Sequence, residues 1–162
     1  MYLAKADILE HVGELEEEIL VPEKVYKEVV IQGKEEGYAD AYRIEDFLDN
    51  SGGKMTDSRN NEIFDELKNN PNLSKADVEV LAIAEERSAI AVVDEDYARG
   101  IADVEGISNH GSVYVVLLLV KRDIISAEKA QEAIDSMVEH GWYCSTDLYA
   151  KVRSKLDELA GD

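Results

Sequence analysis

The chain has 162 residues, of which 45% are hydrophobic and 33% are charged, so we expect a globular domain rather than a disordered segment. Its 36 acidic and 17 basic residues give a net charge of −19, which argues against nonspecific electrostatic binding of nucleic acid. The longest apolar run, VYVVLLLV, is too short to span a bilayer. The single cysteine, Cys144, and the lack of a secretory pattern after Met1 predict a cytoplasmic protein with no membrane partner.

The first part of the chain predicts helices around one short buried strand. Apolar residues at helical spacing predict a helix over 1–11, and EILVP at 18–22 has the pattern of a buried strand. Pro22 suits the first position of a helix, which would end near Gly33. A polar amphipathic helix is expected over 35–49, where the turn cluster NSGG follows it.

Helices and strands alternate in the rest of the chain. The expected elements are helices at 63–67, 75–87, 96–106, 111–123, 126–141 and 145–159, strands at 89–93 and 107–109, and an edge strand at 142–144. Ser74 and Asp77 form a capping-box pattern before the second of these helices. The alternation favours one α/β domain over 1–162, with helices on both faces of a parallel sheet.

Three consecutive acids follow the apolar strand pattern AIAVV. Ligands of open parallel sheets bind beyond the carboxyl ends of the strands, which is where Asp94 is expected. An ordinary acid between a strand and a loop explains Asp94 equally well. Glu95 and Asp96 fit solvated residues, or N-terminal charges that favour the dipole of the next helix.

Two further acids also have simple structural explanations. Asp77 would complete the capping box with Ser74. Glu28 lies about 130° from the middle of the apolar face of its helix, so it is most simply a solvated charge. A cleft that collected three or four acids would nevertheless suit Mg²⁺ or Mn²⁺, because these cations bind carboxylate oxygens and can activate water for phosphodiester cleavage.

Five segments in a fixed order carry a resemblance to a known family. They are VPEKVYKEVV, LSKADVEVLAIA, VVDEDYARGIA, NHGSVYVVLLLVKRDIIS and HGWYCSTDLYAKV. The segments resemble those of PIN-domain proteins, which are metal-dependent nucleases related to VapC-type toxins. They are most similar to a prokaryotic branch of nucleic-acid-binding PIN proteins. The likeness runs from Met1 to about Leu156, and five segments in order are more specific than any one of them.

The resemblance implies a PIN-like three-layer α/β/α sandwich with a parallel sheet, and the activity of a Mg²⁺- or Mn²⁺-dependent endoribonuclease. It implies that Glu28, Asp77 and Asp94 are catalytic and bind the metal, with Asp96 as a fourth ligand. Its partners would then be RNA, a second copy of the chain in a homodimer and, if the protein is of toxin–antitoxin type, an antitoxin protein.

Cationic side chains would have to help such a site to hold its substrate. Arg99 matches an arginine of the family segment, and our other candidates are Lys24, Lys27, Lys121 and Arg122. Solvated lysines on a helix surface are the simpler explanation for most of these residues.

The chain also departs from the family pattern. Ala76 replaces a glycine, Val92 stands where a threonine is common, and Glu95 replaces a second aspartate. The family's opening strand, which is central in its sheet and carries its first catalytic aspartate, has no match here, because the similarity begins after that strand. We therefore expect a sheet without its first strand, owing either to a start assigned too late or to a truncated relative, and little or no RNA cleavage by the chain as it stands.

Two alternative functions remain open. A non-catalytic PIN relative that binds nucleic acid or protein would fit both the absent aspartate and the charge of −19. A structural subunit could instead pair through VYVVLLLV and the terminal helices, and the same apolar segment is our reason to expect a homodimer.

Overall fold

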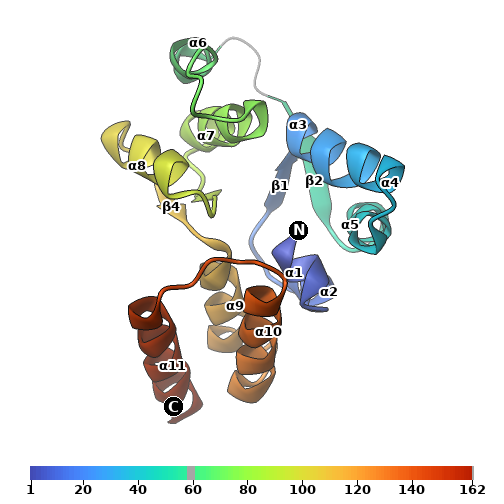
Figure 1. The fold of residues 1–162 in the computed structure, drawn as a ribbon, viewed down its shortest axis with the longest axis vertical. Coiled ribbons are helices and arrows are strands. Elements are labelled where there is room, and N and C mark those ends of the chain that lie inside the picture. Colours follow the sequence, from blue (N-terminus) through green and yellow to red (C-terminus); the bar gives the residue numbers. More distant parts are fainter. Residues whose placement is uncertain (58–60, 162) are drawn as a thin grey trace.

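The computed structural model describes residues 1–57 and 61–161, where helices surround short parallel strands (Figure 1). Up to residue 57 the elements are α1 (Tyr2–Lys5), α2 (Leu9–Val12), β1 (Ile19–Pro22), α3 (Glu23–Tyr26), the π-helical η1 (Lys27–Gln32), α4 (Gly33–Glu35), α5 (Ala39–Asn50) and β2 (Gly53–Thr56). From residue 61 they are α6 (Glu62–Leu67), α7 (Lys75–Arg87), β3 (Ala91–Val92), α8 (Asp96–Val104), β4 (Asn109–His110), α9 (Ser112–Lys121), α10 (Ala127–Glu139) and α11 (Thr146–Gly161).

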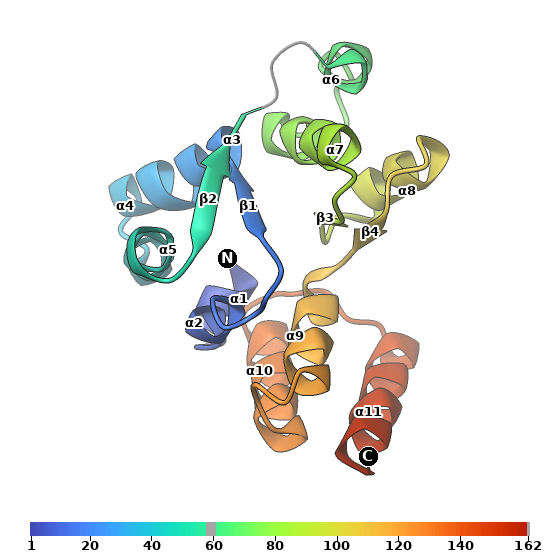
Figure 2. The same ribbon diagram turned by 180° about the vertical axis from the view of Figure 1, so that it is seen from behind.

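The strands form two parallel pairs. β1 pairs with β2 from Ile19 opposite Gly53 to Pro22 opposite Thr56, and β3 pairs with β4. β1 lies on the side of its pair that faces β3 (Figure 2), and α7 packs against both β1 and β3. The expected α/β fold with parallel strands is confirmed. In the described residues, however, the strands form two separate two-stranded sheets, β1 with β2 and β3 with β4.

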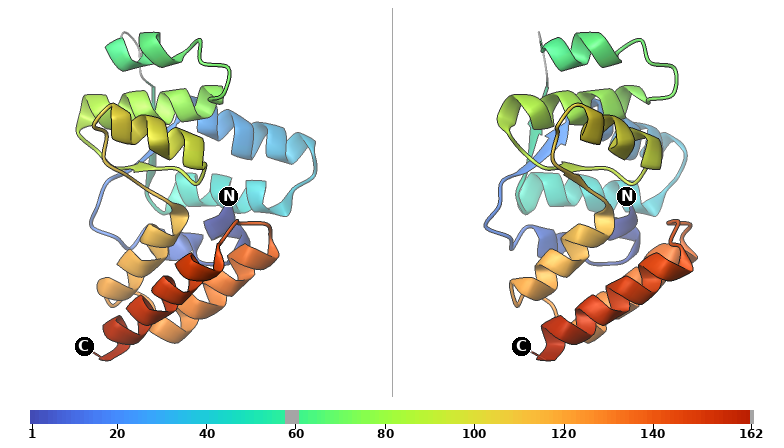
Figure 3. Two further views of the ribbon diagram at one scale, coloured as in Figure 1. Left: turned by 60° about the vertical axis from the view of Figure 1, so that its left-hand side comes forward. Right: turned by 90° about the vertical axis from the view of Figure 1, so that its left-hand side faces the viewer.

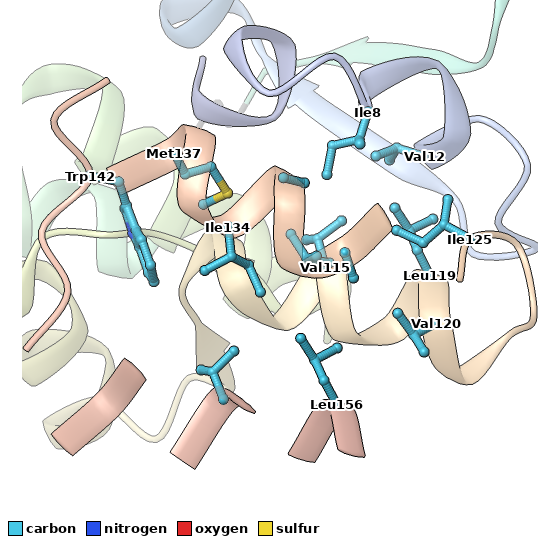
Figure 4. Packing of buried hydrophobic residues seen from close by; sticks show 14 of the residues in the cluster. Ile8, Val12, Val115, Leu119, Val120, Ile125, Ile134, Met137, Trp142 and Leu156 are labelled. Carbon is cyan, nitrogen blue, oxygen red and sulfur yellow. The ribbon is translucent and has the colours of Figure 1, made fainter. Parts of the chain in front are cut away.

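Two larger hydrophobic clusters hold the fold together. One lies among α6, α7, β3 and α8, and the other fills the space among the first two helices and α9, α10 and α11. Figure 3 shows that the C-terminal helices, α9, α10 and α11, form one end of the molecule, and Figure 4 shows the packing of the second cluster. Among its largest fully buried side chains are Ile8 from the connection between α1 and α2, Leu119 from α9, and Ile134 and Met137 from α10.

The apolar segment VYVVLLLV lies in α9 and belongs to this second cluster. Seven of its eight residues, 113–117, 119 and 120, are buried in the cluster or packed against it, and Leu118 is half-buried outside it. Most of the apolar surface that suggested a homodimer is therefore covered by the chain itself, and the homodimer stays a prediction. No helix within 1–57 and 61–161 has both the length and the apolarity needed to cross a membrane.

Several local expectations differ from the structure. The helix expected over 1–11 breaks at Asp7, where φ is 56°, and the helix expected over 35–49 begins only at Ala39. Gly33 does not end its helix. A Cβ there would lie 3.0 Å from the Ala41 Cβ, so this glycine allows close packing against α5. The segment 142–144 is not a strand, and β2 was not expected.

Candidate active-site cleft

Three of the predicted acids line one cleft of about 430 Å³. Glu28 belongs to η1 and Asp77 to the first turn of α7, and Asp94 follows Val93 just beyond the end of β3. Glu28 is exposed, whereas Asp77 and Asp94 are half-buried. Since three separate elements deliver these carboxylates, the fold brings together residues that lie up to 66 positions apart in the chain.

Asp94 is held by three donors. Its Oδ1 accepts the Ser112 backbone N–H at 2.8 Å and the Trp142 Nε1–H at 3.2 Å. Its Oδ2 accepts the Ser112 hydroxyl at 2.6 Å. Ser112 is the first residue of α9, so the carboxylate also lies at the positive end of that helix dipole. Asp94 thus links the end of β3 to the helices that follow.

Two glycines allow this arrangement. A Cβ on Gly111 would lie 3.1 Å from the Asp94 Oδ1, closer than an ordinary contact. Gly141 has φ +95° and follows α10, where its N–H bonds to the Val138 carbonyl and the Trp142 N–H bonds to that of Met137. This is the Schellman pattern of a helix end, and it turns Trp142 back onto the molecule. The expected stop at Gly141 is confirmed.

Asp77 does not complete a capping box. The Ser74 hydroxyl accepts the Asp77 backbone N–H at 3.0 Å, as expected of an N-cap. In the described part of the chain, no donor is bonded to the Asp77 carboxylate in return. Helix capping therefore explains Ser74 but leaves the acid at 77 available to the cleft.

Glu28 lies in an unusual helical segment. η1 is a π-helix of six residues, a rare geometry that often occurs at functional sites. The angle of about 130° assumed 100° per residue, which a π-helix does not follow, so it does not apply to η1. The exposed position of Glu28 agrees with the solvated charge that the sequence favoured. Among the described residues nothing is bonded to the Glu28 carboxylate.

A buried acid that the sequence did not single out supports the same wall of the cleft. Glu79 is only 4% exposed, and its Oε2 accepts the Lys24 N–H at 3.0 Å. This bond satisfies one of the free N–H groups at the start of α3. An acid within the apolar run Val78 to Ile83 was the available signal, because buried acids require a partner.

The acids fit a hydrated metal ion better than a tightly bound one. Within residues 1–57 and 61–161, no three His, Cys, Asp or Glu side chains form a group that could directly enclose a metal. Carboxylate oxygens are nevertheless the ligands that Mg²⁺ prefers, and Mg²⁺ usually keeps several of its waters. The donor set in the cleft therefore suits an ion held partly through water.

Comparison with known proteins identifies the family. The matching family model is DUF3368, a PIN domain, and it covers residues 1–158. The chain belongs to the PIN-domain family. No curated protein and no solved structure matches it. The PIN fold is of the nuclease type, and PIN domains generally use divalent metal ions, in agreement with oxygen donors gathered in one cleft.

A second cavity, of mixed charge, adjoins the acids of this PIN domain. It has a volume of about 570 Å³ and shares Glu28 with the first cavity. Its charged side chains are Lys24, Lys27, Lys75, Glu28, Glu36 and Asp40. The Lys27 Nζ lies 2.7 Å from a carboxylate oxygen of Glu23. Lys24 and Lys75 have no ion-pair partner in the described ranges. The predicted Lys24 and Lys27 thus lie beside the acids, and Lys75 is a cation that sequence reasoning missed.

The Met1 amine also lines this second cavity. Burial lowers the pKa of the amine, while the nearby carboxylates of Asp40 and Asp94 act in the opposite direction.

Three other predicted site residues, Asp96, Lys121 and Arg122, line neither cavity. Asp96 is exposed and lines neither cavity, whereas its neighbour Glu95 lines the acidic one. Lys121 and Arg122 lie at the far end of α9, about 15 Å along the helix from Ser112, and Arg122 pairs with Glu17. This position argues against a role beside the acids.

Arg99 is closer to the site than Lys121 and Arg122. Its Nη1 would lie 3.8 Å from a Cβ on Gly111, beside Asp94. Its buried Nε has no hydrogen-bond partner within the residues described. Arg99 therefore adds positive charge near Asp94.

Proposed function

We propose that this PIN-domain protein is a Mg²⁺- or Mn²⁺-dependent endoribonuclease whose catalytic acids are Glu28, Asp77 and Asp94. One observation carries the proposal: carboxylates from three separate elements line a single cleft. A bound divalent ion would activate water and offset the negative charge that develops on the phosphate. The toxin–antitoxin role, with an antitoxin partner, rests on the PIN family alone.

The neighbouring residues suit a single-stranded RNA substrate. Lys24 and Lys75 lie beside the acids without an ion-pair partner in the described ranges, so they are the cations that would contact phosphate in a chain of net charge −19. Tyr97 lines the acidic cleft, is 45% exposed, and its hydroxyl accepts a hydrogen bond from the Asn70 amide at 3.1 Å. A held aromatic ring gives an unpaired base a surface on which to stack.

Cleavage of single-stranded RNA in Mn²⁺ tests the proposal, with an assay sensitive enough for the weak activity that we expect of the chain as it stands. We expect Asp94→Asn, Asp77→Asn and Glu28→Gln each to lower the cleavage rate at least ~100-fold, as loss of a group that stabilises a transition state does. Glu132→Gln is the matched control, because Glu132 is an exposed acid of α10 that lines neither cavity. Equal cleavage by all four variants would contradict the assignment of these acids.

A second candidate is a non-catalytic PIN relative that binds RNA. It is favoured by the lack of a ready three-residue metal group in the described part of the chain. Such a protein would bind RNA without cutting it. Its affinity for RNA would fall in Lys24→Ala and Lys75→Ala but not in Asp94→Asn, and the wild-type chain would show no cleavage, so binding and cleavage measured side by side separate the two functions.

A further inference from the structure

We propose that Ser112 and Trp142 are positioning residues that make Asp94 a ligand through one oxygen only, Oδ2. The metal-binding part of this inference rests on the proposed function. The positioning part rests on the three hydrogen bonds to the Asp94 carboxylate.

The first step is a count of acceptor sites. An ionised carboxylate offers about four lone-pair sites, two on each oxygen. The bonds from the Ser112 N–H and the Trp142 indole use both sites of Oδ1. The Ser112 hydroxyl uses one site of Oδ2. The remaining site for a cation or its water is therefore on Oδ2, and Asp94 cannot bind a cation through both oxygens without losing a donor.

The second step concerns the rigidity of the donors. Ser112 is 9% exposed and its N–H is fixed by its place at the start of α9. Trp142 is 6% exposed and packs in the cluster that includes Ile134 and Met137 (Figure 4). Its backbone is fixed by the bond to the Met137 carbonyl at the end of α10. Ser112 therefore belongs to α9, and Trp142 lies just after α10, where its backbone bond and its packed ring limit how far it could follow the carboxylate.

The third step is the cost of losing a donor. Removing the indole N–H frees a site on Oδ1, and removing the Ser112 hydroxyl frees a site on Oδ2. In either case the carboxylate can rotate, and an acid that must order itself on binding holds a cation less tightly. Removal of a group that orients a metal ligand typically weakens metal affinity ~10- to 100-fold.

The positioning role can be tested without metal. Trp142 is the one tryptophan of the chain, so its indole N–H gives one side-chain signal in a ¹H–¹⁵N NMR spectrum. We expect this signal to move upfield in Asp94→Asn, because a bond to a charged acceptor is replaced by a weaker neutral one. A backbone spectrum that stays dispersed shows that the variant is folded. An indole signal that does not respond to Asp94→Asn overturns the proposal.

The consequence for metal binding is measured by the electron paramagnetic resonance signal of free Mn²⁺. We expect Trp142→Phe and Ser112→Ala to weaken binding ~10-fold. Ser112→Thr keeps a hydroxyl group and should therefore retain the Mn²⁺ affinity of the wild-type chain. Ile134→Val is the control, because it trims the same hydrophobic cluster without removing a donor.

The possible results separate the two proposals. Equal Mn²⁺ affinity in Trp142→Phe, Ser112→Ala and Ile134→Val overturns the one-oxygen role of Asp94. If the wild-type chain bound no Mn²⁺, the proposed nuclease function would fail, and the indole signal would still decide whether Ser112 and Trp142 hold Asp94.

Discussion

Asp94 and Glu28 line the same cleft, but the chain holds them in opposite ways. Asp94 is half-buried and bonded to three donors from two other parts of the molecule. Glu28 is exposed on a π-helical turn, with no bonded partner among the described residues. One wall of the cleft is therefore organised before anything binds, and the other wall contributes a side chain that a ligand would have to order.

The difference follows from what each acid does for the fold. Asp94 joins the end of β3 to the start of α9, so it connects the strands with the helices at the other end of the molecule. On the Glu28 wall the structural acid is Glu79, which holds the start of α3 from α7. On one wall, Asp94 both supports the fold and lines the cleft. On the other wall, Glu79 supports the fold and Glu28 lines the cleft.

The largest expected effect tests this contrast directly. Asp94→Ala leaves the buried Ser112 hydroxyl, the Ser112 N–H and the Trp142 indole without an acceptor. Since each unsatisfied buried group costs ~1–3 kcal/mol and water can reach part of this site, we expect a loss of about 3 kcal/mol in the free energy of unfolding. Glu28→Ala should change it by less than ~0.5 kcal/mol. Urea unfolding followed by Trp142 fluorescence measures both, and similar losses would remove the distinction between the two walls.

Glu79 should show the next largest effect. Glu79→Ala leaves the Lys24 N–H unbonded at the start of α3 and opens a space in the core, so we expect a loss of about 2 kcal/mol. Glu79→Gln keeps an acceptor oxygen and should lose less. Glu86→Ala, an exposed acid on the same helix, is the control in the same unfolding experiment. A Glu79→Ala variant as stable as this control would show that the buried carboxylate does not support the Glu28 wall.

Much of this site could be predicted from local sequence signals. The N-cap at Ser74, the helix stop at Gly141 and the place of Asp94 after an apolar strand each depend on a few adjacent residues, and the structure contains all three. The order of the family segments added the PIN fold, which residues 1–158 match. Local chemistry and segment order therefore carried most of the fold and the choice of acids.

The partners of these acids could not be predicted in the same way. The Trp142–Asp94 bond joins residues 48 positions apart, and the Glu79–Lys24 bond joins residues 55 apart. Such pairs depend on how helices pack, which no spacing rule contains. Trp142 was expected in an edge strand because aromatic residues favour strands, but the turn at Gly141 decides its conformation. The π-helical turn at Glu28 likewise has no sequence signature.

A smaller effect is expected at Asp77, the third acid. Ser74→Ala removes the acceptor for the Asp77 N–H and should cost about 1 kcal/mol, as loss of an N-cap usually does. Asp77→Asn removes only a charge near the helix N-terminus and should cost ~0.5 kcal/mol or less. Thermal unfolding of the two variants compares them. A larger loss in Asp77→Asn than in Ser74→Ala would mean that the acid has a structural role, which would place Asp77 with Asp94 rather than with Glu28.

The smallest expected effect comes from substituting two glycines by alanine. Gly111 lies beside Asp94, whereas Gly100 tests only the helix propensity of alanine. Gly100 lies inside α8 with no atom within 4 Å of a Cβ built there, so Gly100→Ala should stabilise the protein by about 0.5–1 kcal/mol through the better helix propensity of alanine. In Gly111→Ala the new methyl group would lie 3.1 Å from the Asp94 Oδ1, so the carboxylate or the backbone must move. We expect Gly111→Ala to lose up to ~1 kcal/mol and to shift the Trp142 indole signal, whereas Gly100→Ala leaves that signal in place. If both substitutions stabilise the protein equally and the indole signal stays where it is, the Asp94 wall is less rigid than its three hydrogen bonds indicate, and the contrast with Glu28 is one of burial alone.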